Sequence, residues 1–75
     1  MRYDELKIDE VYINEGSTIG LGLEQVVEKD GKLFLKTIKR IKNYWWPLYH
    51  ISEVHSHIVY DTLRELTPLE KIKYL

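Results

Sequence analysis

The dipeptide Asp30-Gly31 is the feature that most constrains the fold of this 75-residue chain. It lies between two apolar runs, Val26-Val27 and Leu33-Phe34-Leu35. Asp and Gly can both adopt positive φ, which the two central residues of a type I′ turn require, and the twist of that turn matches a β-hairpin. The sequence therefore predicts that the two runs pair as neighbouring antiparallel strands.

The segment before this turn also has the pattern of a strand. Apolar residues alternate with polar or small ones from Ile19 to Glu28, which gives one apolar face. Gly20 and Gly22 share a face, where they permit sharp bending or the close approach of another backbone. Upstream, a short strand over Val11-Tyr12-Ile13 is expected to end in a turn over Asn14-Glu15-Gly16-Ser17.

The segment after the turn, residues 33–46, fits two structures. Its apolar residues recur at helical spacing from Phe34 to Leu48, with lysines on the opposite side. The hairpin requires instead that at least Leu33 to Thr37 pair with the preceding strand. Pro47 would end any helix by Trp46. We favour a strand.

Three shorter elements are expected beyond Pro47. Leu48 to Ile51 and His57 to Tyr60 have the composition of two further strands. Thr67-Pro68-Leu69-Glu70 has a capping-box pattern with proline in the first turn, which predicts a helix over residues 67–75. Its apolar edge, expected to dock it, consists of Leu69, Ile72 and Leu75.

The order of these features resembles the small SH3-like barrels, including the KOW-like and Tudor-like groups. The matching segments are an opening strand over residues 7–13, a long bent hairpin over residues 19–38, and a closing helical turn over residues 60–68. The resemblance implies a small antiparallel barrel of about five short strands, used as a binding module. We therefore expect a mainly β fold, α+β at the margin, in one domain of residues 1–75, with a β-rich part over residues 6–61.

Composition limits the class of protein further. A chain this short has a thin core, and it contains no cysteine for a disulfide or a Cys-based zinc site. No run is long and apolar enough for a membrane span, and Met1-Arg2-Tyr3-Asp4-Glu5 does not have the character of a signal peptide. We expect a cytoplasmic protein.

Charge is distributed unevenly along the chain. Residues 1–30 carry eight acidic residues against three basic ones, whereas residues 32–42 carry five basic residues and no acidic one. Folding can bring the two zones together so that they neutralise each other. If the zones lie on different faces, the basic one can attract an anionic partner.

The aromatic residues concentrate directly after this basic strip. Tyr44, Trp45, Trp46 and Tyr49 lie within six residues, and such rings bury large areas while keeping a polar group for recognition. Because successive residues of a strand face opposite sides, at least one tryptophan is expected in the core. The candidate partner-binding residues are Tyr44, Trp45, Trp46, Tyr49, Lys39, Arg40 and Lys42.

Metal binding and catalysis have weaker signals. His55 and His57 could share a strand face, and with Glu53 or Asp61 they are weak candidates for a metal site. No cysteine nucleophile, serine elbow or phosphate-binding glycine loop is present. We expect no enzyme activity, no cofactor and no small-molecule substrate.

The expected function is a small adaptor or regulator that docks a protein partner, or a second copy of itself, through the aromatic and basic residues. A nucleic-acid-binding module that uses the same residues is the alternative, because such binders combine stacking rings with a cationic groove. The near-neutral isoelectric point of about 6.3 argues against it. The size of the chain suits an accessory protein of a virus or mobile element.

Overall fold

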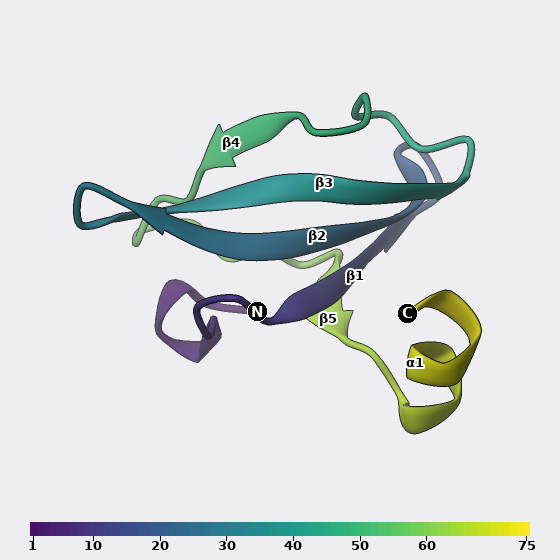
Figure 1. Cartoon of the computed structure of the whole chain (residues 1–75). Helices are drawn as coiled ribbons and strands as arrows, with labels where there is room; N and C mark the ends of the chain where they lie inside the picture. The colour runs from purple at the N-terminus through teal and green to yellow at the C-terminus, as the bar shows by residue number, and fades with distance from the viewer.

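The computed structural model describes all 75 residues, and its five antiparallel strands form one sheet in the order β4-β3-β2-β1-β5 (Figure 1). The elements are η1 (Tyr3–Glu5), β1 (Val11–Gly16), β2 (Gly20–Lys29), β3 (Lys32–Lys42), β4 (Ile51–Glu53), β5 (Leu63–Glu65) and α1 (Pro68–Tyr74). The prediction of a mainly β fold with a C-terminal helix is confirmed. The edge strands β4 and β5 do not pair with each other, so the sheet is not closed into a barrel. Neither helical element has the length and apolar character needed to cross a bilayer.

The β2–β3 hairpin is the long central unit of the sheet. Asp30 and Gly31 have φ values of 53° and 76°, as the predicted turn requires, and Val26 and Val27 pair with Leu35 and Phe34. The strand favoured for residues 33–46 is therefore confirmed as far as residue 42, and the helical alternative is wrong. The β2–β3 register shifts twice around residues 21–24, and such bulges bend a hairpin.

Two glycines let the end of β3 lie close against β2. A Cβ atom on Gly20, whose φ is 82°, would meet the backbone oxygens of Lys42 and Asn43. A Cβ atom on Gly22 would overlap the ring of Tyr44. The close approach of another backbone expected at these glycines is confirmed at Gly20, whereas at Gly22 the Tyr44 ring fills the space that a side chain would occupy.

The outer strands differ from the prediction. Residues 57–60 form no strand, only an isolated bridge between Arg2 and Val59. The fifth strand is β5, within the segment where the resemblance implied a helical turn. Leu63 pairs with Asn14 of β1 and is buried. Because Leu63 is buried against the sheet, this segment forms a strand rather than a helical turn.

Two more boundaries move by a few residues. β4 begins at Ile51 rather than at Leu48, because Tyr49 has a φ of 67° and interrupts extended pairing. β1 continues to Gly16, which pairs with Gly20, so the turn expected over residues 14–17 lies at residues 17–19.

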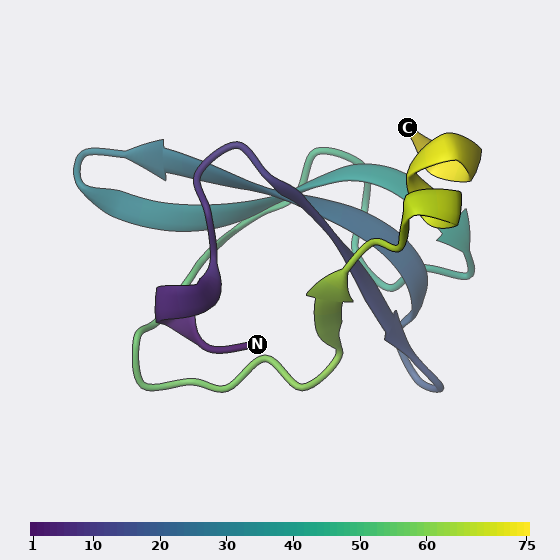
Figure 2. The same ribbon diagram turned by 90° about the horizontal axis from the view of Figure 1, so that it is seen from below.

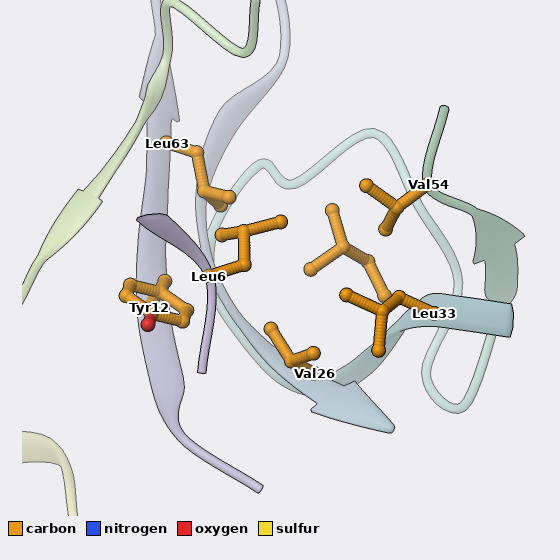
Figure 3. Close-up of a cluster of buried hydrophobic side chains, with 7 residues drawn as sticks. Leu6, Tyr12, Val26, Leu33, Val54 and Leu63 are labelled. Carbon is orange, nitrogen blue, oxygen red and sulfur yellow. The ribbon is translucent and has the colours of Figure 1, made fainter. Parts of the chain in front are cut away.

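Buried side chains form one cluster on each face of the sheet. The larger cluster lies beneath the bent hairpin, where side chains from four strands and the flanking segments point toward one another (Figure 3). It consists of Leu6, Tyr12, Val26, Leu33, Leu35, Val54 and Leu63. The smaller cluster, on the other face, consists of Ile13, Leu23 and Leu66.

The start of α1 is fixed by polar groups. Thr67 Oγ1 accepts a hydrogen bond from the Glu70 amide at 3.2 Å, and Glu70 Oε1 accepts one from the Thr67 amide at 2.9 Å. The predicted capping box is thus confirmed. Arg64 donates to both carboxylate oxygens of Glu70, at 2.8 and 2.9 Å, and thereby lowers the pKa of Glu70 to about 2.

The side of α1 that faces the sheet is not the predicted one. Glu70 and Tyr74 are four residues apart and share a face, and Tyr74 packs against the smaller cluster. The predicted docking edge is exposed instead: Leu69, Ile72 and Leu75. α1 lies at the end of the molecule opposite the β2–β3 turn (Figures 1 and 2).

Replacing Gly22 with alanine is expected to destabilise the fold, because the new methyl group would occupy the space of the Tyr44 ring. Overpacking of this kind costs about 1–3 kcal/mol, measurable as a lower free energy of unfolding in urea. Gly16→Ala is the control, since its nearest neighbour is a carbon of the flexible Ile19 side chain. Equal stability of Gly22→Ala and the wild type would show that Tyr44 does not need this space.

Candidate functional site

The predicted aromatic residues lie on a loop of residues 43–50, called here the aromatic loop. β3 ends as Asn43 takes a φ of 48°, and the chain then returns along the hairpin toward β4 (Figure 1). The Trp45 amide donates to the Ile19 carbonyl at 2.7 Å. At the other end, Thr37 of β3 bonds to Tyr49 and His50 through its carbonyl and its amide, at 2.7 and 2.9 Å.

The structure separates the four aromatic residues into buried and exposed ones. Tyr44 is only 2% exposed and belongs to the interior, whereas Trp45 and Tyr49 are each 64% exposed. Trp46 is half-buried. The expectation that a tryptophan lies in the core is wrong, because this segment is a loop rather than a strand and Tyr44 takes the inward position.

Two of the three accessible rings already have partners within the chain. Trp46 stacks on His50 with ring centroids 4.9 Å apart and an interplanar angle of 4°. Lys36 Nζ lies 5.4 Å from the centre of the Tyr49 ring, a cation–π distance. The Trp45 ring lies edge-on to Trp46, with ring centroids 6.4 Å apart, and is 64% exposed. Trp45 is therefore the ring most free to enter a partner.

The predicted basic residues form no salt bridges, and of them Arg40 is the one bonded to this loop. Arg40 Nη2 donates to the Tyr44 carbonyl at 2.8 Å and Lys39 Nζ to the Tyr74 carbonyl at 3.1 Å. The salt bridges of the chain involve Lys32, Arg64 and His55. Lys36, Lys39, Arg40 and Lys42 form no salt bridge with a carboxylate.

Sequence reasoning left three residues of this surface out of the site. Lys36 belongs to the basic strip, and its register opposite Ile51 places it beside the loop. Leu48 and Ile51 are 47% and 54% exposed, and they add apolar area next to Tyr49. Residues 48–51 are predicted as a strand, in which alternate side chains are buried, so the sequence offers no reason to place Leu48 and Ile51 on the same surface.

A buried polar network lies directly beneath the aromatic loop. Glu24 of β2 is 3% exposed, and its Oε1 accepts hydrogen bonds from the Tyr44 hydroxyl at 2.5 Å and from Thr37 Oγ1 at 2.8 Å. Asn14 Nδ2 donates to the Tyr44 hydroxyl at 3.0 Å, and Thr62 Oγ1 donates to Asn14 Oδ1 at 2.5 Å. The network thus joins β1, β2, β3 and the loop through side chains.

The second oxygen of the Glu24 carboxyl, Oε2, has no hydrogen-bond partner. Burial raises the pKa of Glu24 above its ordinary value, while the hydrogen bonds from Tyr44 and Thr37 and the nearby His50 act in the opposite direction. Burial and the neighbouring Glu24 raise the pKa of Tyr44. Sequence alternation put Glu24 on the polar face of its strand, but its register partners Tyr12 and Thr37 are buried, and the buried Tyr44 of the loop bonds to it.

The histidine candidates do not form a metal centre. His55 and His57 have ring centroids 5.7 Å apart, and Glu53 lies 3.4 Å from His55 Nδ1. No group of three or more His, Asp or Glu side chains in the chain is arranged to hold a metal ion. Both histidines are exposed on the segment that follows β4.

Comparisons of the chain with protein-family models, with curated proteins and with solved structures found no match. The function is therefore argued from this surface alone.

Replacing Glu24 with glutamine is expected to change how stability depends on pH. A carboxyl whose pKa is raised in the folded state stabilises the fold most below its ordinary pKa, and this contribution is lost as pH rises through the raised value. Relative to Glu24→Gln, the wild type should therefore lose free energy of unfolding as pH increases from about 4.5.

Urea unfolding of both proteins across acid and neutral pH measures this difference. Glu28→Gln is the matched control, since Glu28 is exposed on the same strand. A constant difference between the wild type and Glu24→Gln across the range would mean that burial does not perturb Glu24.

Proposed function

We propose that this chain is a small cytosolic module that docks a protein partner through the aromatic loop and the cations of β3. The exposed Trp45 is the observation that carries the proposal. An indole that is 64% exposed leaves a large apolar area in water, and tryptophan is enriched among the residues that dominate binding energy at interfaces. The absence of cysteine fits a reducing compartment.

Charge supports a partner that carries carboxylates. Lys36, Arg40 and Lys42 form no salt bridge within the chain. Opposite charges steer association and fix the orientation of two surfaces. A partner segment with an apolar side chain for Trp45 and acidic residues beside it would match both properties of the surface.

The ring geometry favours a protein over a single-stranded nucleic acid. Nucleic-acid platforms present several rings on which successive bases stack. Here Trp46 is stacked on His50 and Tyr49 lies under Lys36, which leaves one free ring. A single aromatic anchor beside apolar side chains is more typical of a protein interface.

The fold proposed for this module is an open relative of the small SH3-like barrels. The strand order β4-β3-β2-β1-β5 supports it, because the long bent hairpin lies at the centre and β1 pairs with both β2 and the last strand. Barrels of this kind host many functions, so the proposed docking role depends on the surface residues rather than on the fold.

Trp45→Ala is expected to weaken partner binding without unfolding the domain. Peptides selected on the immobilised protein from a displayed random library should combine acidic and apolar residues. Loss of a central tryptophan costs about 2 kcal/mol, or roughly 30-fold in affinity, which fluorescence anisotropy of a labelled peptide measures.

Leu69→Ala is the matched control, because Leu69 is equally apolar and exposed but lies on α1. Selected peptides that bind Trp45→Ala as tightly as the wild type would contradict the proposal. Salt-sensitive binding of single-stranded oligonucleotides that Trp45→Ala abolishes would replace it with nucleic-acid recognition.

A further inference from the structure

The aromatic loop is held on the sheet by Tyr44, whose hydroxyl bonds to the buried carboxyl of Glu24. Tyr44 enters the interior from the loop, packs on Gly22, and donates its hydroxyl to Glu24. The other ties of the loop are the Asn14 bond to the Tyr44 hydroxyl, the backbone bonds to Ile19 and Thr37, and the Arg40 bond to the Tyr44 carbonyl. Glu24 is thus the one carboxyl whose protonation state acts directly on the seat of the loop.

The surroundings of Glu24 do not compensate a negative charge well. Its Oε1 receives two neutral donors and its Oε2 receives none. The hydroxyls that bond to it, those of Thr37 and Tyr44, carry no positive charge. The other polar and titratable neighbours, from β1, β3 and the loop, are Tyr12, Asn14, Arg40 and His50.

We propose that Glu24 is a proton-dependent latch for the aromatic loop. The loop is seated as observed when Glu24 is protonated, and ionisation shifts the population toward a loosened state in which Tyr44 leaves Gly22 and the carboxylate reaches water. This regulates the docking surface and rests on the proposed function for its role, but the latch itself is a property of the free chain.

The difference between the pKa values of Glu24 in the seated and loosened states sets the direction in which pH shifts the loop. Burial in the seated state raises the pKa of Glu24, whereas water restores the ordinary value in the loosened state. The seated state therefore binds the proton more tightly, and each unit of difference between the two pKa values changes the ratio of seated to loosened loop about tenfold. Rising pH loosens the loop, and acid seats it.

The chain contains its own reporter of this equilibrium. Trp45 and Trp46 are its only tryptophans, and both lie on the aromatic loop. The experiment records tryptophan emission of the free protein from pH 4 to pH 8, with far-ultraviolet circular dichroism to follow the sheet. We expect a one-proton shift toward longer wavelength as pH rises, while the circular dichroism stays constant.

Three variants separate the latch from other causes. Glu24→Gln cannot ionise, so its emission should stay at the acid value of the wild type. Tyr44→Phe keeps the ring but loses the hydrogen bond, so its emission should be shifted to longer wavelength even at acid pH. His50→Gln should keep the transition, which excludes direct quenching of Trp46 by the stacked imidazole.

A flat wild-type profile overturns the proposal, as does a transition that persists in Glu24→Gln or disappears in His50→Gln. If Glu24→Gln fails to fold, the Tyr44→Phe result decides, and emission identical to the wild type at every pH overturns the latch. None of these readings needs a partner. Failure of the latch therefore leaves the docking role standing, and loss of peptide binding leaves the latch standing.

Discussion

The Tyr44 ring packs on Gly22, and its hydroxyl donates a hydrogen bond to Glu24. The position of the aromatic loop against β2 depends on this interaction. It folds the end of β3 back onto β2, which requires a residue without a side chain at position 22. It also fixes where the chain turns outward, so that Trp45 lies in solvent one residue later. A hydrogen bond between neutral groups contributes about 0.5–1.5 kcal/mol net, which matters in a domain whose total stability is only a few kcal/mol.

The same contact introduces a conflict into the interior. A purely apolar side chain at position 24 could be buried without needing any hydrogen bond. The residue there is instead a glutamate, and one oxygen of its carboxyl has no hydrogen-bond partner. Buried polar groups that are only partly satisfied destabilise a fold, and they concentrate at functional sites. Here that group is the Glu24 carboxyl, which lies beneath the loop that carries both tryptophans of the chain. The partly satisfied carboxyl and the proposed binding surface are therefore at the same place.

The sequence predicts which segment carries the aromatic and basic residues of the candidate site, but not which of its rings are buried, stacked or exposed. Trp45 and Tyr49 are exposed as a binding surface needs, whereas Tyr44 is interior and Trp46 is stacked on His50. These roles follow from two residues with positive φ, Asn43 and Tyr49, which place the segment outside the regular pleat. Alternation assigns sides only within a strand, so no periodic pattern could show which ring points inward.

What the sequence determined by itself was local: the hairpin at Asp30-Gly31, the strand that follows it, and the helix that Thr67 caps. Each depends on residues within a few positions of one another, whose backbone preferences and capping bonds act without the rest of the chain. The tertiary structure alone decided that β5 replaces a turn, that α1 docks through Tyr74, and that Glu24 is buried. Those outcomes depend on which distant residue lies opposite, because burial is a property of the assembled sheet and not of a segment.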